Sequence, residues 1–186
     1  VGWRELSKGA GPMRLALVMS CVSLHAMDVF VTSTILPSVV DDIDGVAFYA
    51  WPSALYLITS IVGAASGGMV GANHGLRRAL AIAASVYLLG SIGCAVAPNM
   101  AVFLVGRTAQ GLGAGLLVAL SYAMVGQLFA DALRPRVIAL ISAIWGLAAL
   151  FGPLYAGAFA QFGFWRGVYW ITFPIIVVML VIARRA

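Results

Sequence analysis

The residues best suited to do chemistry lie in one apolar run near the N-terminus, Leu15–Val40. Asp28 sits near its middle, and the run is long enough to cross a bilayer. An aspartate at that depth costs roughly 2.5–3.5 kcal/mol on insertion scales, so it usually faces the protein interior or a wet cavity and has a function. His25 and Thr32 lie three residues before it and four after it, so a helix places all three on one face. We therefore predict that Asp28 binds and releases a proton within the membrane.

A second polar pair, Arg107 and Gln110, lies one helical turn apart in another apolar stretch. An arginine at this depth needs a carboxylate, carbonyl groups or water nearby. One interpretation places Arg107 in a functional cavity, and the other has it snorkelling to the membrane boundary. His25 is either a proton partner of Asp28 or a polar residue bonded to a neighbouring helix. For Asp28 the alternative to proton binding is a structural role in capping or packing.

The composition is that of a membrane protein with several spans. The chain has 186 residues, of which 63% are hydrophobic and 9% charged, whereas soluble domains average about 25% charged. The net charge of +5 does not indicate a nucleic-acid partner, because the basic residues lie in short loops between apolar runs. Cys21 and Cys94 fall within apolar runs without paired spacing, so we expect neither a disulfide nor a metal site. No cofactor is expected.

The apolar runs predict an all-α membrane protein with six transmembrane helices in one bundle, residues 1–186. The helices are expected at about 14–38, 47–71, 79–97, 101–129, 137–160 and 167–183. Pro98-Asn99 and Arg134-Pro135-Arg136 break the chain between helices. Pro153 lies inside the fifth helix and is expected to kink it.

Charge asymmetry predicts the orientation of these helices. If six helices alternate, nine basic residues fall on one side: Arg4, Lys8, Arg14, Arg77, Arg78, Arg134, Arg136, Arg184 and Arg185. The other side carries Asp41, Asp42 and Asp44 and a single arginine, Arg166. The positive-inside rule then places both termini in the cytoplasm, in a multi-pass protein of the cell inner membrane.

A faint internal repeat at an offset of 89 residues agrees with two groups of three helices. Ser53-Ala54, Gly63, Gly68 and Arg77 recur as Ser142-Ala143, Gly152, Gly157 and Arg166. An odd number of spans separates the copies, so they would be inverted in the membrane. The sequence thus favours a 3+3 inverted-repeat bundle.

Four segments carry motifs in a fixed order. In MDVFVTSTILPSVVDDI, from Met27, an aspartate precedes a Thr-rich turn and a Leu-Pro step. GMVGANHGLRRAL, from Gly68, is similar to G-x-L-A-D-R-x-G-R-K-x-x-L, with matches at Gly68, Gly75, Arg77 and Leu80. RTAQGLG, from Arg107, is similar to R-x-x-Q-G-x-G. AALFGPLYAG, from Ala148, is similar to G-x-x-x-G-P-x-x-G-G, with matches at Gly152, Pro153 and Gly157.

Together these segments resemble the N-terminal half of a major facilitator superfamily transporter, in its drug:proton antiporter branch. The resemblance covers nearly the whole chain and implies half of a major facilitator fold. One departure is Ala72, which stands where the family's loop signature has an aspartate that makes charge contacts. That loop is expected to be a weaker latch, with Arg77 and Arg78 reduced to orienting the helix. Asp131 and Arg134 resemble the charged pair that complements the loop.

The resemblance and the residue types assign expected roles. Proton coupling is expected of Asp28, His25 and Arg107. The substrate cavity is expected to include Thr32, Gln110, Tyr56 and Tyr122. Conformational roles are expected of Gly68, Gly75, Arg77, Arg78, Asp131, Arg134, Gly152, Pro153 and Gly157.

The function expected is proton-coupled secondary active transport, exporting an amphipathic small molecule as multidrug efflux pumps do. No nucleotide-binding loop, Ser/His/Asp set or carboxylate pair indicates ATP-driven transport or an enzyme. An uncoupled facilitator and a lipid-handling transporter of the same fold are the alternatives. The expected partners are membrane lipid, substrate and protons, together with a missing C-terminal six-helix half. A second copy of this half, forming a homodimer, would serve instead of that missing half.

Overall fold

The computed structural model describes residues 11–185, which are almost entirely helical. The elements are α1 (Gly11–Ile43), a short 3-10 helix (Val46–Phe48), α2 (Trp51–His74), α3 (Leu76–Ala95), α4 (Met100–Leu128), α5 (Arg134–Gln161), α6 (Gly167–Trp170) and α7 (Thr172–Arg185). Helices α1 to α5 are long and apolar enough to cross a membrane. The prediction of an all-α membrane protein is confirmed. Arg4 and Lys8 lie outside the described residues.

The last predicted span differs most from its expected form. Instead of one continuous helix over 167–183, the structure has α6 and α7 separated by a turn at Ile171. Pro174 has no N–H to donate to the carbonyl of Trp170, so the helical ladder loses a bond there. The hydroxyl of Thr172 instead donates to the carbonyl oxygen of Tyr169, at 2.6 Å.

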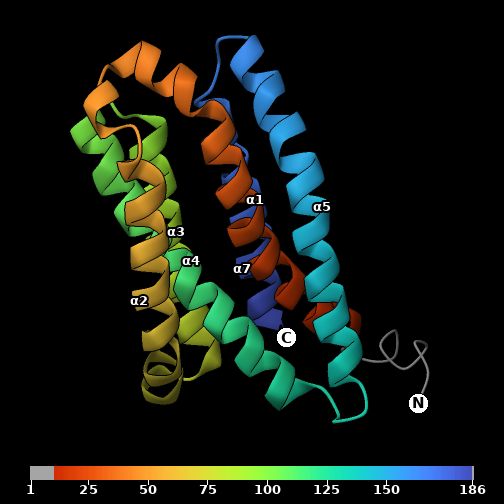
Figure 1. The fold of residues 1–186 in the computed structure, drawn as a ribbon. Helices are drawn as coiled ribbons and strands as arrows, with labels where there is room; N and C mark the ends of the chain where they lie inside the picture. The colour runs from red at the N-terminus through yellow and green to blue at the C-terminus, as the bar shows by residue number, and fades with distance from the viewer. Residues whose placement is uncertain (1–10, 186) are drawn as a thin grey trace.

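Helix α1 continues beyond its predicted end and passes through Pro37. Its last part turns aside from the axis of the first part, toward α2 and α3 (Figure 1). The hydroxyls of Ser33 and Thr34 both donate to the carbonyl oxygen of Phe30, a pattern that often bends helices. A bend here therefore has two local causes, these hydroxyl bonds and the donor that Pro37 lacks.

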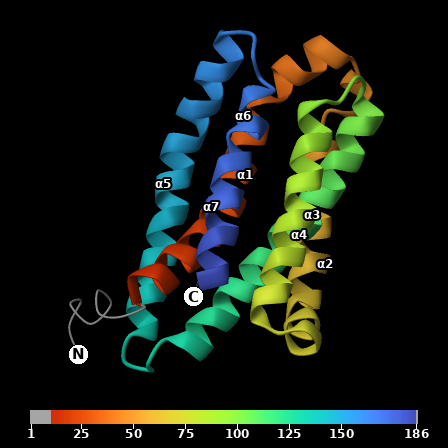
Figure 2. The same cartoon turned by 180° about the vertical axis from the view of Figure 1, so that it is seen from behind.

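The helices form two groups that meet along α1 and α4. Helices α2 and α3 pack against α4, whereas α5 and α7 lie beside α1 (Figures 1 and 2). Helix α2 packs along α4, and α5 packs along α1. The predicted repeat relates α1 to α4 and α2 to α5, so these two contacts are equivalent to each other. Helix α4 crosses the bundle, so it contacts both groups.

The loops alternate between the two ends of the bundle. The start of α1, the α2–α3 turn, the α4–α5 loop and the end of α7 lie at one end (Figures 1 and 2). The α1–α2, α3–α4 and α5–α6 connections lie at the other. Arg14, Arg77, Arg78, Arg134 and Arg136 therefore gather at the first end, which we call the basic end.

Glycines let α4 approach its neighbours closely. A Cβ added at Gly115 would lie 1.9 Å from the carbonyl oxygen of Ser60 on α2, and one at Gly113 would lie 2.4 Å from the backbone nitrogen of Tyr87 on α3. In lipid such close packing replaces the hydrophobic drive that holds soluble helices together. Because α4 is held against both neighbours, the side chains it carries toward the bundle interior have fixed positions.

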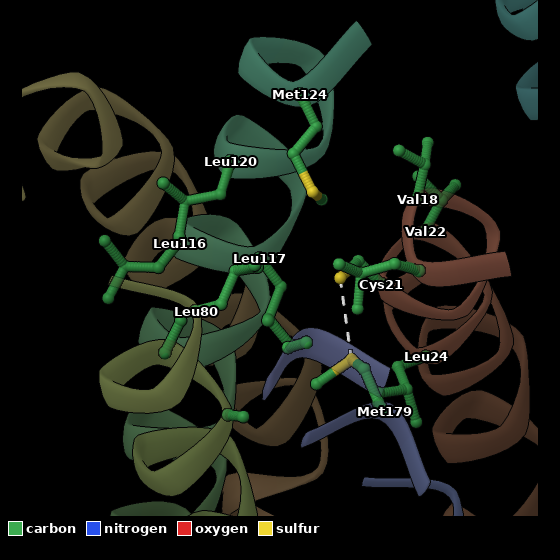
Figure 3. Packing of buried hydrophobic residues seen from close by; sticks show 14 of the residues in the cluster. Val18, Cys21, Val22, Leu24, Leu80, Leu116, Leu117, Leu120, Met124 and Met179 are labelled. Carbon is green, nitrogen blue, oxygen red and sulfur yellow. Dashed lines mark hydrogen bonds between the residues drawn. The ribbon is translucent and has the colours of Figure 1, made fainter. Parts of the chain in front are cut away.

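An apolar core that includes Cys21 fills the space between α1, α3, α4 and α7. Cys21 on α1 points its sulfur at the sulfur of Met179 on α7, at 3.5 Å, beside Leu117 of α4 (Figure 3). Cys21 and Cys94 are both buried and free of disulfides. Both are buried as the sequence predicts, and Cys94 Sγ also donates to Gln110 Oε1 at 3.9 Å.

Candidate functional site

The site is built around an ion pair between α1 and α4. Arg107 Nη1 donates to Asp28 Oδ2 at 2.6 Å, and the side chains are 1% and 5% exposed. The same nitrogen donates to Gln110 Oε1 at 2.6 Å, and Gln110 Nε2 donates to Asp28 Oδ1 at 3.1 Å. The three side chains thus form a closed ring of charge-assisted hydrogen bonds.

The helices explain why this ring forms. Arg107 and Gln110 lie one turn apart on α4, so they present neighbouring polar groups to α1. Arg107 is buried and paired, so it does not snorkel to the membrane boundary. A charged pair in this environment is tolerated only when its remaining donors and acceptors are also satisfied.

Neighbouring helices supply further partners, two of which the sequence did not indicate. Arg107 Nε donates to the carbonyl oxygen of Pro52, at 3.4 Å, where α2 begins. Gln110 Nε2 donates to Ser91 Oγ on α3, at 3.0 Å. Ser91 is an ordinary residue in an apolar helix, so only its place opposite Gln110 identifies it. A backbone carbonyl such as that of Pro52 leaves no sequence signal at all.

The phenol group of Tyr56 connects His25 to the hydrogen-bonded ring of Asp28, Arg107 and Gln110. The guanidinium carbon of Arg107 lies 4.2 Å from the ring centroid of Tyr56 on α2, a cation–π contact. The Tyr56 hydroxyl in turn lies 2.9 Å from His25 Nδ1, and the indole of Trp145 on α5 meets the imidazole edge to face. His25 therefore bonds to a neighbouring helix. Trp145 was not expected at the site.

The other predicted cavity residues divide into two kinds. Thr32 is buried on α1, and its hydroxyl has no hydrogen-bond partner within residues 11–185. Tyr122 is 49% exposed and belongs to none of the contacts that surround Arg107. The structure thus brings Thr32, Tyr56 and Gln110 toward the buried interior but leaves Tyr122 on the outside of this bundle.

A small cavity of about 170 Å³ reaches Asp28 from the side of α5, α6 and α7. Met27 and Val31 of α1, Tyr87 of α3 and Tyr155 of α5 contribute to its mostly apolar lining. The hydroxyl of Tyr87 is buried without a partner within residues 11–185. Asp28 therefore lies between Arg107 on one side and an apolar cavity on another.

The predicted conformational residues of α5 differ in their surroundings. Pro153 lies inside the helix, as the sequence requires. A Cβ added at Gly152 would lie 3.0 Å from Phe30 Cβ on α1, so this position is tightly packed. One added at Gly157 would meet nothing within 4 Å among the described residues. Close packing within the chain is thus found at Gly152 and not at Gly157.

The charged contacts expected between the α2–α3 loop and the pair Asp131 and Arg134 are not found among the described residues. Asp131 pairs with Arg134, at 2.6 Å, and Arg134 also donates to carbonyl groups at the end of α4. Among the described residues, Arg77 and Arg78 make no ion pair. Gly75 has a φ of +74°, which explains a glycine between α2 and α3, whereas Gly68 has open space beside it.

These features indicate what the site can do chemically. Within residues 11–185, no group of three or more His, Cys, Asp or Glu side chains is placed to hold a metal ion. The ring instead contains one group that can take up a proton, Asp28, and one permanent cation, Arg107. The buried arginine therefore depends on this carboxylate for its counter-charge.

Comparisons with known proteins identify relatives of this chain. A probable multidrug-efflux transporter of Mycobacterium tuberculosis is 40% identical over 165 residues, which is 88% of this chain and 35% of that protein. An efflux pump of Gibberella fujikuroi is 32% identical over 178 residues, 94% of this chain and 32% of that protein. The chain spans about a third of the length of these curated relatives.

A solved structure shares the fold. The inward-open xylose transporter XylE from E. coli superposes with a TM-score of 0.74 and 19% identity, covering 94% of this chain and 48% of that one. The family model of the Major Facilitator Superfamily matches residues 18–186. The chain therefore belongs to the Major Facilitator Superfamily.

Proposed function

We propose that this chain is the N-terminal six-helix half of a proton-coupled transporter that exports an amphipathic small molecule. The observation that carries the proposal is the buried ring of Asp28, Arg107 and Gln110, which places a titratable group inside the bundle. Two relatives, a probable multidrug-efflux transporter and an efflux pump, support the cargo class.

The way Arg107 is shared between Asp28 and Gln110 supports the proposal of proton coupling. With Asp28 ionised, Nη1 of Arg107 bridges the carboxylate and Gln110. When Asp28 takes up a proton, the attraction between the two side chains falls, and the arginine depends more on Gln110, the Pro52 carbonyl and the Tyr56 ring. Two arrangements of the same side chains then differ in free energy, and a proton selects between them. His25 senses this change through Tyr56.

Substrate is proposed to bind beside this ring. The apolar cavity next to Asp28 suits a lipophilic group, and Tyr87 in its lining offers a hydroxyl to a polar one. Thr32 is buried one turn further along α1 and does not line this cavity. Tyr56 and Gln110 contribute from the ring itself. Tyr122 would contribute only where the exposed side of α4 meets another part of the transporter.

The test is pH-gradient-driven transport by the full-length protein in sealed vesicles. Asp28→Asn mimics the protonated form and should abolish proton-driven export while leaving cargo binding, which also verifies folding. Asp28→Glu should retain some activity because the titrating group survives. Asp42→Asn is the matched control, since it removes an aspartate from the same helix outside the ring. Wild-type pumping by Asp28→Asn would mean that Asp28 is structural.

An uncoupled facilitator, including one that handles lipid, is the second candidate. The observation that favours it is that Arg107 already neutralises Asp28 in this structure, as a purely structural ion pair would. Such a protein would move cargo down its own gradient at a rate independent of the pH gradient. Measuring cargo exchange with and without a pH gradient in the same vesicles separates the two.

The orientation and assembly are also proposals. The gathering of arginines at the basic end supports cytoplasmic termini in the cell inner membrane. Cysteines placed at Asn73 and Ala132 should then label from the cytoplasm, and one at Asn99 from outside; labelling of Asn99 from the cytoplasm would overturn the orientation.

The bundle is proposed to be completed by a C-terminal six-helix half or by a second copy of this chain. The intact mass of the native protein distinguishes these.

A further inference from the structure

A pocket of about 420 Å³ opens at the basic end, away from the buried ring. His74, Arg77 and Arg78 form its polar side, where α2 turns into α3. Leu17 of α1 and Met124 of α4 contribute to its apolar wall. The pocket therefore joins a cationic rim to a hydrophobic interior at the depth where a spanning helix leaves the hydrocarbon.

Within residues 11–185, no ion pair balances the charges of the two arginines at this pocket. The five aspartates of the described residues include one at the basic end, Asp131, and it is already paired with Arg134. Arg77 and Arg78 make no ion pair within the described residues. Residues 68–80, which form the turn and its two flanks, contain no aspartate or glutamate, so the surrounding segment supplies no anion to these arginines.

Arg14 adds a further cation close by. Its Nη1 donates to the carbonyl oxygen of Leu128, a residue that lines the pocket. Its Nε is buried and has no hydrogen-bond partner among residues 11–185. Arg14 therefore adds positive charge next to the pocket without lining it.

We propose that this pocket binds an anionic phospholipid, with the phosphodiester held by His74, Arg77 and Arg78 and an acyl chain against the apolar wall. A free phosphate would use the cationic rim and leave the apolar wall bare. A headgroup at the end of a spanning helix lies at the level where the chain already presents its arginines. The lipid thereby supplies a negative charge that residues 68–80 do not. The proposal is independent of cargo and of coupling.

The test uses the full-length protein purified in detergent and native mass spectrometry. Dioleoylphosphatidylglycerol and dioleoylphosphatidylcholine carry the same acyl chains, so their comparison isolates the headgroup charge. The anionic lipid should be retained preferentially. Arg77→Gln/Arg78→Gln should lower its affinity on the order of 30-fold, because each arginine near an anionic surface contributes about 1 kcal/mol. Leu128→Ala should weaken lipid binding several-fold while leaving the charges in place.

The matched control is Arg134→Gln/Arg136→Gln, which removes two arginines of the same end from outside the pocket. It should lower affinity much less than Arg77→Gln/Arg78→Gln. Equal losses in the two double variants, or equal retention of the two lipids, would overturn the proposal. Inorganic phosphate that displaces the anionic lipid at equal concentration would show instead that the rim binds free phosphate.

Discussion

Helix α1 carries two aspartates that each pair with an arginine from a distant part of the chain. Asp28 pairs with Arg107 in the interior, with side chains 5% and 1% exposed. Asp42 pairs with Arg166 at the end opposite the basic end, with side chains 47% and 30% exposed. The residue types are the same, so the difference between the pairs is one of surroundings.

The surroundings change what each pair does. The exposed pair gains from Trp165, whose indole N–H donates to Asp42 at 3.1 Å and whose ring lies under the guanidinium of Arg166. Arg166 also donates to the carbonyl oxygen of Ala97, so it connects α1, the end of α3 and the start of α6. Because the side chains of this pair are partly open to water, solvent screens their attraction. The side chains of the other pair are buried, so losing one of them leaves the remaining charge uncompensated.

The largest effect is expected from removing one charge of the buried pair. Asp28→Asn leaves Arg107 without a counter-charge and Arg107→Gln does the reverse, so each should lower the free energy of unfolding by about 3–5 kcal/mol. The double variant should recover a large part of this loss. Thermal unfolding of the full-length protein in detergent measures all three. Losses that simply add would mean that the two charges do not interact.

A smaller effect is expected from opening the buried ring without changing its charge. Gln110→Leu removes the donor to Asp28 and Ser91 and the acceptor of Arg107, at a cost of about 1–3 kcal/mol. Ser91→Ala is the control, because it removes a single hydrogen bond and should cost about 1 kcal/mol. The same unfolding measurement applies. If Gln110→Leu does not lower the free energy of unfolding, the hydrogen bonds of Gln110 do not stabilise the ring.

At the exposed pair, the two partners should differ from each other. Arg166→Gln loses the ion pair, the bond to Ala97 and the contact with Trp165, so it should cost about 1–2 kcal/mol. Asp42→Asn loses one exposed carboxylate charge and should cost less than about 1 kcal/mol. Comparing their melting temperatures tests this order. Equal costs would show that the ion pair alone holds the contact.

The smallest effect is a difference in response to salt. Raising NaCl from about 0.05 M to about 0.5 M shortens the Debye length severalfold, so exposed charges are screened and buried ones much less. The stability difference between wild type and Asp42→Asn should shrink toward zero, while that between wild type and Asp28→Asn should persist. If salt removes both differences, the interior pair is open to water.

Much of the fold could be predicted because the bilayer makes strong local demands. A span needs about 20 apolar residues, so hydropathy located the helices, and arginines between them indicated which loops share an end. The structure differs from the prediction at the ends of two helices, where single residues determine whether the helix continues. A missing N–H at Pro174 divides the last span, and α1 runs past Pro37 to Ile43.

The site was predicted only in part. Asp28 and Arg107 were identified because charged side chains are rare at bilayer depth, and Gln110 because it lies one turn from Arg107. Ser91, Trp145 and the Pro52 carbonyl became visible only through their contacts, since none is unusual in its own helix. Tyr122 shows the converse, because a polar aromatic on α4 need not face the interior.

The sequence by itself determined that this chain crosses a membrane several times and carries an aspartate and an arginine within its spans. Both conclusions depend only on the hydropathy and charge of neighbouring residues. Only the tertiary structure decided that Asp28 meets Arg107, 79 residues away, whereas Asp42 meets Arg166. Pairing depends on how far each helix is rotated and how closely its neighbours approach. Here glycines such as Gly113 and Gly115 set that approach, and their effect appears only when α2, α3 and α4 are packed together.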